Sequence, residues 1–475
     1  MEFDKDLSAR QEARALCQQA EQAAQQLRRM TQPQLDAIVQ AMAQAFSRAS
    51  AVLAEQATQE TGFGNAADKT VKNRFASEAV LAAIRDMKTV GVLSEDPQQK
   101  LWQIGVPVGV IAAIVPSTNP TSTICYKALI ALKSGNAIVF SPHPKALRCS
   151  LAAAKIVTQA AEQAGAPKGS IGCLSLGQMA GTEELMHAPQ VNLILATGGP
   201  GMVKAAYSSG KPAIGVGAGN GPAYIHPSAN VRQALACILR SKSFDFGTVC
   251  ASEQSIIVEK AMAAQVKETA KQMGFHFMST SEADQLAKLL FKPNGSLSPT
   301  VVGKSAQQLA KISGFPVPPD TKVLVAACDG VGPQHPYSME KLCPVLAFFQ
   351  EENEAAVLKR SLEILHHEGR GHTFSIHAED RDVIRRFALQ MPVSRFLVNT
   401  PAALGGIGQS TGLFPALTLG CGAVGGSSSS NNISPMDLIN IRRVAWDLGT
   451  QPQAELKVDS DLIELLTAKI LERLK

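Results

Sequence analysis

Several features that would mark a membrane, secreted or nucleic-acid-binding protein are missing from this chain of 475 residues. No uninterrupted apolar run reaches the roughly 20 residues that a bilayer-spanning helix needs. The first residues, Met1–Asp6, are charged and lead into an Ala/Gln-rich pattern without an apolar signal-peptide core. No block of Lys and Arg occurs, and a net charge of +5 is small for this length. We therefore expect a soluble, cytoplasmic protein without a nucleic-acid or membrane partner.

Paired cysteines are also missing. The nine cysteines are odd in number and widely spread, with no C-x-x-C pair. This distribution favours reduced thiols and argues against a disulfide framework or a zinc site, so no metal is expected. Aromatic residues are few, but 45% of the residues are hydrophobic. A chain of this length can therefore bury more than one core, and two or three domains are predicted.

The apolar runs predict an α/β fold. Residues 7–90 are rich in Ala, Gln, Leu and Met, which favours packed helices. The run Val110–Val115 is typical of a strand buried on both faces of a parallel sheet. Helical and strand-like stretches alternate after it, which predicts a doubly wound sheet followed by a second α/β portion. The further strands are predicted at 136–140, 171–176, 192–196, 255–258, 323–327 and 345–349.

One thiol, Cys250, differs from the other cysteines in its surroundings. It lies in the segment Phe244–Gln254, after Gly247 and ahead of the apolar run Ser255–Val258. The thiol is therefore predicted on a loop that leads into a strand. A thiol on such a turn can be aimed at a substrate, whereas a cysteine in an apolar stripe usually packs as a small hydrophobic residue.

The Phe244–Gln254 segment resembles the nucleophile segment of the aldehyde dehydrogenase superfamily, in particular of its coenzyme A-acylating branch. The resemblance extends over roughly residues 5 to 450, with several motifs in the family's order. It implies an aldehyde dehydrogenase-like fold with a Rossmann-like cofactor domain at 1–244, including a bridging strand pair near 97–109. A catalytic thiol domain at 245–425 and a β oligomerisation arm at 426–448 would follow. Residues 449–475 are predicted as a linker and an amphipathic helix.

A second matching loop, Pro116–Pro120, follows the first buried strand. In the family, an Asn amide in this loop helps to stabilise an oxyanion, which makes Asn119 the counterpart. Its amide and the Cys250 backbone N–H would face the developing charge, each typically worth about 3 kcal/mol. The alternative, from the residues alone, is an ordinary Asn-Pro turn.

The segment Ala213–Pro222 lacks a carboxylate. Hydrolytic relatives carry a water-activating Glu there, so its absence implies that the acyl-enzyme waits for the thiol of coenzyme A. The resemblance assigns a catalytic base to His372, because an imidazole titrates near neutrality. The neighbouring His366, His367 and His377 are competing candidates.

The usual glycine fingerprint of a dinucleotide site is absent. Thr197–Gly201 supplies a glycine turn ahead of a helix start instead, where bare backbone and the helix N-terminus favour phosphate. Taken alone, this is also an ordinary tight turn. Nothing in Ser141–Pro144 decides between NAD and NADP, and Leu342-Cys343 replaces the family's Phe-Gly after Glu340, the expected ribose ligand. The resemblance assigns the cofactor to Pro116, Ser117, Thr118, Ser141, His143, Pro144, Thr197, Gly198, Gly199, Gly217 and Glu340.

The function implied is reversible oxidation of a short aliphatic aldehyde to its acyl-CoA with NAD or NADP, by a homo-oligomer that is a dimer or a tetramer. Alternatives are an acyl-phosphate reductase, a sulfoacetaldehyde-specific enzyme and a non-enzymatic microcompartment component. In the tail, Ile463, Leu466, Ile470 and Leu474 form a stripe at helical spacing. The stripe would pack on its own subunit or direct the enzyme into a bacterial microcompartment through a shell or core partner.

Overall fold

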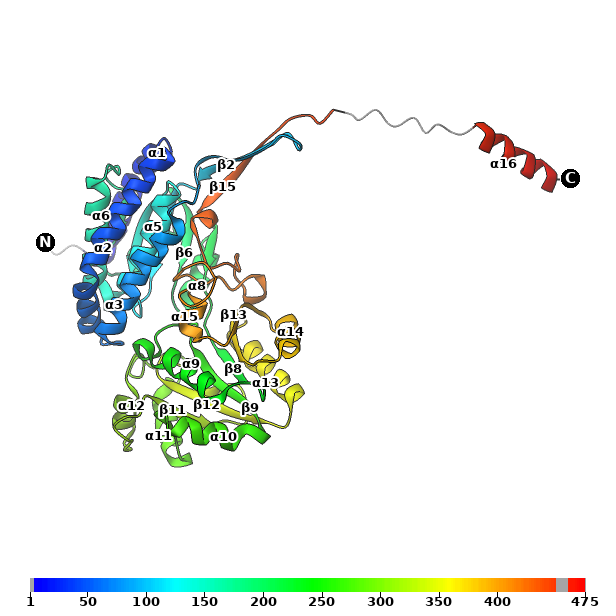
Figure 1. Ribbon diagram of the computed structural model, residues 1–475. Coiled ribbons are helices and arrows are strands. Elements are labelled where there is room, and N and C mark those ends of the chain that lie inside the picture. Colours follow the sequence, from blue (N-terminus) through cyan, green and yellow to red (C-terminus); the bar gives the residue numbers. More distant parts are fainter. Residues whose placement is uncertain (1–3, 450–459, 475) are drawn as a thin grey trace.

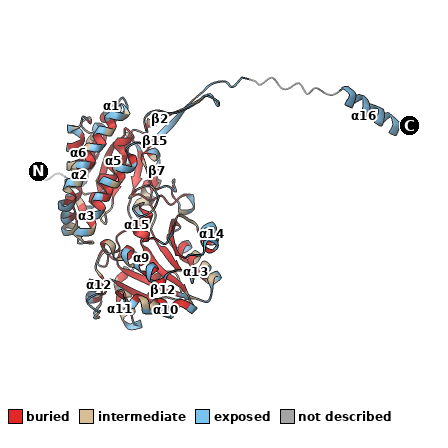
Figure 2. Cartoon of the chain, in the orientation of Figure 1, coloured by how far each residue is buried: buried red, intermediate tan, exposed pale blue. Residues whose placement is uncertain are grey.

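The computed structural model describes residues 4–449 and 460–474. The described part contains a five-stranded and a seven-stranded parallel sheet, a three-stranded antiparallel sheet and a separate C-terminal helix (Figure 1). The strands of the two parallel sheets are largely buried, whereas the antiparallel sheet and the last helix carry many exposed residues (Figure 2). Within the described ranges, no helix combines the length and the apolarity needed to cross a membrane.

A layer of helices begins the fold, as the composition predicts. The first helix is capped by the Asp4 carboxylate and buries one face through small residues such as Ala13 and Cys17. Small side chains let this helix approach its neighbours closely. The elements of the layer are α1 (Lys5–Leu27), α2 (Gln32–Thr61), α3 (Ala66–Arg74), a π-helical turn (Phe75–Ala79) and α4 (Val80–Ile84).

The five-stranded sheet has the order β5-β4-β3-β6-β7. Every residue of β3 (Val110–Val115) is buried, as expected for a strand covered on both faces. The strand order reverses direction between β3 and β6, and such a switch point opens a crevice at the carboxyl ends of the strands. The other strands are β4 (Ala137–Pro142), β5 (Ile171–Cys173), β6 (Val191–Ala196) and β7 (Ala213–Gly215). The helices are α5 (Pro120–Lys133), α6 (Leu147–Gln163), α7 (Met179–His187) and α8 (Pro200–Ser208).

The seven-stranded sheet has the order β10-β11-β12-β9-β8-β13-β14. Its middle strand β9 (Glu253–Glu259) begins three residues after Cys250. The other strands are β8 (Gly221–Ile225), β10 (Phe275–Phe277), β11 (Val323–Ala327), β12 (Val345–Glu351), β13 (Gly371–His377) and β14 (Val393–Val398). The helices are α9 (Val231–Ser243), α10 (Lys260–Lys271), α11 (Thr280–Leu290), α12 (Ala306–Ser313), α13 (Glu354–His367), α14 (Arg381–Gln390) and α15 (Ala402–Gly406).

The predicted boundary at residue 244 lies after the change of sheet. Strand β8 pairs with β9 and β13, so the chain enters the seven-stranded sheet between β7 and β8. Helix α9 packs on the same sheet through Leu235 and Ile238. The apolar run of β8 suits either parallel sheet, so its sequence does not reveal which one it joins.

The antiparallel arm contains β1 (Gly91–Asp96), β2 (Leu101–Pro107) and β15 (Ile439–Ala445). It therefore joins two chain segments more than 300 residues apart and extends away from the body (Figure 1). The bridging pair predicted near 97–109 is formed by β1 and β2, somewhat earlier in the chain. Helix α16 (Ser460–Arg473) lies apart from the body, and all its described residues are exposed.

Candidate active site

Cys250 lines a cavity of about 270 Å³ at the place where the two parallel sheets approach each other. A second cavity of about 320 Å³ adjoins it and shares the wall formed by Pro116, His143 and Thr197–Gly199. Every residue that the sequence assigns to the site, except His372, lines at least one of the two cavities. The segments predicted from separate motifs therefore meet in one cleft.

The strand order explains why these segments meet. Asn119 lies in the loop after β3, and Thr197–Gly199 follows β6. Because β3 and β6 are the neighbouring strands at the switch point, their carboxyl ends open into the same crevice. The turn before β9 brings Cys250 from the other sheet to this crevice.

The second cavity lies against the N-terminus of α8. Gly199 is the N-cap of α8, and a Cβ added there would meet no described atom within 4 Å. Bare backbone at the positive end of a helix is suited to a phosphate group. The cavity continues past Ser141 and Pro144 at the end of β4, while Glu340 lies at the Cys250 end of the cleft. The predicted cofactor residues are thus arranged along one path.

The Cys250 thiol is protonated at neutral pH. Burial raises its pKa to about 12, the Glu340 carboxylate and the Cys421 thiol add to the increase, and Arg395 opposes it. A thiol is a weak nucleophile in this state, since the thiolate is the reactive form. Its proton must therefore leave as the sulfur attacks, or be removed by a nearby base.

Glu340 is the one carboxylate among the described residues that line the Cys250 cavity. Its Oε1 accepts a hydrogen bond of 3.0 Å from the Gly219 backbone N–H. Burial, together with the nearby Glu368 carboxylate, raises the pKa of Glu340 to about 8. The segment that lacks a carboxylate also lines this cavity, through Val216 and Gly217. No residue of that segment can activate a water molecule.

His372 does not line either cavity. It is fully buried in β13, where its Nδ1 lies 2.9 Å from the Thr373 hydroxyl and its Nε2 has no partner among the described residues. Burial lowers the pKa of His372 to about 3, and Arg395 lowers it further. The imidazole is therefore neutral and weakly basic in this arrangement. Its role as catalytic base stays a prediction from the resemblance.

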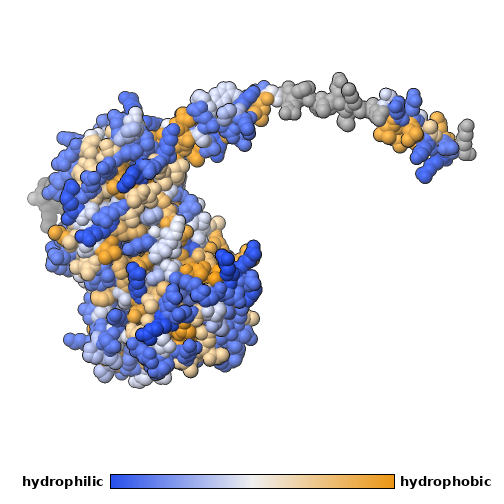
Figure 3. All heavy atoms as spheres, viewed as in Figure 1, coloured by the Kyte–Doolittle hydropathy of each residue, from blue (hydrophilic) through white to orange (hydrophobic). Residues whose placement is uncertain are grey.

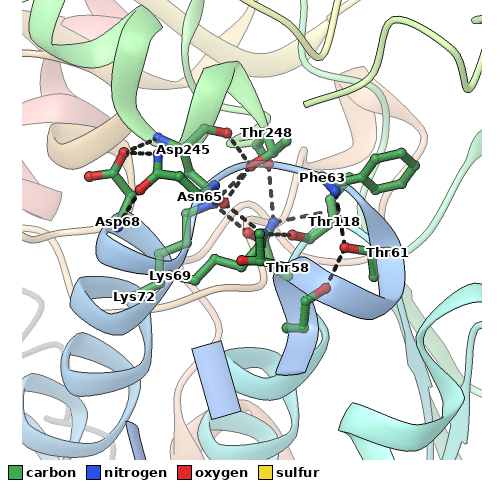
Figure 4. A network of polar contacts seen from close by, with 12 residues as sticks. Thr58, Thr61, Phe63, Asn65, Asp68, Lys69, Lys72, Thr118, Asp245 and Thr248 are labelled. Atoms are coloured by element: carbon green, nitrogen blue, oxygen red, sulfur yellow. Dashed lines mark hydrogen bonds and ion pairs between the residues drawn. The ribbon is translucent and has the colours of Figure 1, made fainter. Parts of the chain in front are cut away.

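Sequence reasoning missed a buried charged network beside the cleft (Figure 4). Asp245 Oδ2 lies 2.8 Å from Lys69 Nζ and 2.5 Å from Lys72 Nζ, and all three side chains are almost fully buried. Burial would raise the pKa of Asp245, but the two ammonium groups hold it below its usual range. Burial lowers the pKa of Lys72 to about 8. Lys72 also lines the Cys250 cavity.

The chain is similar in sequence to aldehyde dehydrogenases. The model of the "Aldehyde dehydrogenase family" matches residues 5–277. The bifunctional aldehyde-alcohol dehydrogenase of Escherichia coli strain K12 is 44% identical over 439 residues. The match covers 91% of this chain but 49% of that protein. The chain therefore spans about half the length of this relative.

Solved structures match over nearly their whole length. An acetylating aldehyde dehydrogenase from Geobacillus thermoglucosidasius is 47% identical, with a TM-score of 0.93, covering 95% of this chain and 100% of that chain. A propionaldehyde dehydrogenase from a fucose utilisation bacterial microcompartment of Clostridium phytofermentans is 26% identical. Its TM-score is 0.83, and the match covers 90% of this chain and 96% of that chain.

Proposed function

Because the chain belongs to the aldehyde dehydrogenase family, we propose that it oxidises a short aldehyde to an acyl-CoA, reversibly, with Cys250 as the nucleophile. The observation that carries this proposal is the composition of the Cys250 cavity. A thiol lies beside an amide donor and a cleft that continues to the N-terminus of α8, and the segment around Val216 offers no base for water. Such a site can form a thioester but is poorly equipped to hydrolyse it.

The first step joins Cys250 Sγ to the carbonyl carbon of the aldehyde. The thiol loses its proton, and the carbonyl oxygen becomes an anion as its double bond opens. Asn119 Nδ2 and the Cys250 backbone N–H are the donors for this oxygen. Donors fixed in place before the reaction lower the barrier, typically by about 3 kcal/mol each.

The cleft residues hold and orient the dinucleotide. When bound, a nicotinamide ring accepts a hydride from the carbon attached to Cys250. The backbone at Gly198 and Gly199 and the N-terminus of α8 would hold phosphate, and Glu340 would accept the ribose hydroxyls. We propose NAD as the acceptor, with NADP as the alternative. Initial rates with each dinucleotide at equal concentration distinguish them.

The thiol of coenzyme A then attacks the thioester carbonyl. A new C–S bond forms to coenzyme A, the bond to Cys250 breaks, and the Cys250 sulfur regains a proton. Val216 lies in the segment where hydrolytic relatives carry their base, so water has no assistance there. The reverse sequence reduces an acyl-CoA to the aldehyde.

The test follows NADH absorbance after the protein is mixed with acetaldehyde and NAD⁺, with coenzyme A or inorganic phosphate added separately. We expect sustained turnover only with coenzyme A. Sustained turnover with phosphate alone would favour the alternative, an acyl-phosphate reductase. Turnover with neither co-substrate, together with acid release, would contradict the proposed absence of a hydrolytic base.

We propose acetaldehyde or propionaldehyde as the substrate class. The apolar side chains of Val249, Ile407 and Leu419 line the cavity around Cys250 and suit a short aliphatic chain. The alternative is sulfoacetaldehyde, whose sulfonate would need a cation, and Lys72 is already engaged by Asp245. Comparing kcat/KM for the three aldehydes decides between these substrates.

We propose that the antiparallel arm pairs with a second copy of the chain. Trp102 and Trp446 meet on it edge to face at 5.0 Å, and both remain substantially exposed. Apolar side chains on a projecting sheet favour burial by a partner. The mass of the native protein measured by light scattering should correspond to a dimer or a tetramer, and a monomer would contradict this proposal.

We also propose that α16 directs the enzyme into a bacterial microcompartment. Ile463, Leu466 and Ile470 are about half exposed, and apolar and charged residues alternate on the surface of this helix (Figure 3). The helix does not pack on the described body of its own chain. A reporter fused to residues 449–475 should co-purify with shells, and Ile470→Asp should abolish this without changing the activity of the full chain. A reporter that stays free of shells would refute the proposal.

A further inference from the structure

Three chain segments meet at the Asp245 carboxylate, on the side of the cleft that carries Asn119. Asp245 lies in the turn before Cys250, and Lys69 and Lys72 come from α3. Lys69 Nζ also donates to the Thr118 backbone oxygen at 2.9 Å. Figure 4 shows both lysine side chains converging on Asp245. The network therefore connects the helical layer and the loop after β3 to the nucleophile turn.

The network contains one more cation than the carboxylate needs. Lys69 alone neutralises Asp245 at 2.8 Å. Burying a second ammonium group is costly, because burial disfavours the charged form. A second buried cation therefore calls for a reason other than pairing with Asp245.

The contacts of Lys72 supply that reason. Its Nζ donates to Asp245 Oδ2 at 2.5 Å, to Asn119 Oδ1 at 2.6 Å and to Thr248 Oγ1 at 3.0 Å. An ammonium group has three donors, so these partners account for its full capacity. One of them is the amide on which oxyanion stabilisation depends.

The ammonium group fixes which way the Asn119 amide faces. Lysine can only donate, so the amide must present Oδ1 to Lys72 and Nδ2 to the opposite side. On that side Nδ2 donates to the Thr248 backbone oxygen at 3.1 Å and to the Thr118 hydroxyl oxygen at 3.3 Å. A flipped amide would bring its NH₂ against the ammonium group and its oxygen against the Thr248 carbonyl. Both contacts would be repulsive.

We propose that Lys72 is a positioning residue, which holds the Asn119 amide with its NH₂ group, and not its oxygen, on the side of the oxyanion. A flipped amide would turn a carbonyl oxygen towards the developing negative charge and would raise the barrier. The inference rests on the proposed function, because it assigns Lys72 to the step in which Cys250 attacks the aldehyde. Lys72 acts through Asn119 and does not contact the reacting atoms.

The same network holds the turn that carries the nucleophile. Asp245 and Phe246 have φ angles of +46° and +51°, which residues with side chains rarely adopt. The Asp245 backbone N–H donates to Asp68 Oδ2 at 2.7 Å, and Asp245 Oδ1 accepts from the Asn65 N–H at 2.9 Å. A Cβ at Gly64 would lie 1.8 Å from Asp245 Oδ1, so only glycine allows this approach. The position of Asp245, and hence of Lys72, is closely determined.

The chain offers a matched control. Lys69 and Lys72 have the same charge, the same burial and the same carboxylate partner, but only Lys72 contacts Asn119. Removing either lysine leaves Asp245 with one counter-charge, so both Lys69→Met and Lys72→Met keep a balanced pair. The two variants should lose similar amounts of thermal stability. They should differ in the rate at which the acyl-enzyme forms.

The experiment measures the pre-steady-state burst of NADH with acetaldehyde and NAD⁺ in wild type, Lys69→Met, Lys72→Met, Asn119→Ala and the Lys72→Met/Asn119→Ala double variant. Losing an oxyanion donor typically costs about 100-fold to 1,000-fold in rate. We expect Lys72→Met to slow the burst by about 10-fold to 100-fold, with the aldehyde KM changed less than about 3-fold. When Asn119 is already replaced by Ala, adding Lys72→Met should lower the burst rate by less than about 3-fold.

Two results would overturn the role of Lys72. One is a double variant whose loss of burst rate equals the product of the two single losses, which would mean that Lys72 acts independently of Asn119. The other is a loss of burst rate in Lys69→Met that is as large as the loss in Lys72→Met. If Lys72→Met does not fold, Lys72→Gln replaces it, because the Gln amide keeps an N–H donor without the charge. A burst within about 3-fold of wild type in Lys72→Gln supports the proposal, and a loss as large as that of Asn119→Ala contradicts it.

The outcomes separate this inference from the function on which it rests. A wild-type protein that gives no burst and no CoA-dependent NADH would refute the proposed function. A wild-type protein that is active while Lys72→Met retains the full burst rate, or while Lys72→Gln loses as much burst rate as Asn119→Ala, would refute the positioning role alone.

Discussion

Replacing Asp245 by Asn removes the charge at the centre of the buried network while nearly keeping the side chain's shape. The Asn oxygen can still accept from the Asn65 N–H, but the NH₂ group would then face the ammonium groups of Lys69 and Lys72. Two buried cations would be left without their carboxylate. Breaking a buried pair in this way typically costs about 3–5 kcal/mol.

That cost should appear as a large drop in thermal stability. Since 1 kcal/mol shifts Tm by roughly 2–4 °C in a domain of 150–250 residues, we expect Asp245→Asn to lower the apparent Tm by about 10 °C. The measurement is differential scanning calorimetry at fixed protein concentration and pH 7. Lys69→Met, which leaves one balanced pair, should lose markedly less.

The pH dependence of the thermal stability provides a second test of the same network. The two lysines hold the pKa of Asp245 below its unfolded value, so its pairing stabilises the folded state above the ordinary aspartate pKa of about 3.9. This contribution is lost as the pH falls towards the folded-state pKa. The difference in Tm between wild type and Asp245→Asn should persist down to about pH 4 and become smaller below it. A Tm within about 2 °C of wild type at pH 7 would refute the reasoning.

Two further predictions concern the Cys250 cavity. Because the pKa of Cys250 is raised to about 12, its alkylation by iodoacetamide, taken relative to Cys250→Ala, should accelerate about 10-fold per pH unit between about pH 7 and pH 10. A plateau near neutrality would mean that the resting sulfur is a thiolate. Val216→Glu should raise CoA-independent acid formation by about 10-fold or more, because it supplies a base for water. Unchanged hydrolysis, with the variant folded, would mean that water is excluded by other means.

Local patterns in the sequence predicted the main features of fold and cleft. The apolar runs of β3 and β6 mark strands buried on both faces, and the loops that follow them carry Asn119 and the Thr197–Gly199 turn. Each of these features is contained in a few consecutive residues. The relation between them follows from the strand order, which no local pattern in the sequence shows.

Contacts between distant segments could not be predicted in this way. Lys72 and Asp245 are 173 positions apart, and neither the spacing of the lysines nor the Phe-Asp-Phe-Gly sequence indicates their pairing. Strand β8 carries an apolar run that suits either sheet, so the point at which the chain changes sheet could not be predicted. His372 lies in a strand whose residues are all buried, and its sequence does not show whether the imidazole reaches the cavity.

The central claim is that an acyl group is carried by Cys250 until coenzyme A removes it. The most direct measurement is mass spectrometry of the intact protein and its peptides after incubation with NAD⁺ and acetaldehyde in the absence of coenzyme A. We predict one acetyl group, located on the peptide that contains Cys250, and its disappearance with formation of acetyl-CoA when coenzyme A is added. An acetyl group on another cysteine, or one that coenzyme A does not remove, would contradict the claim.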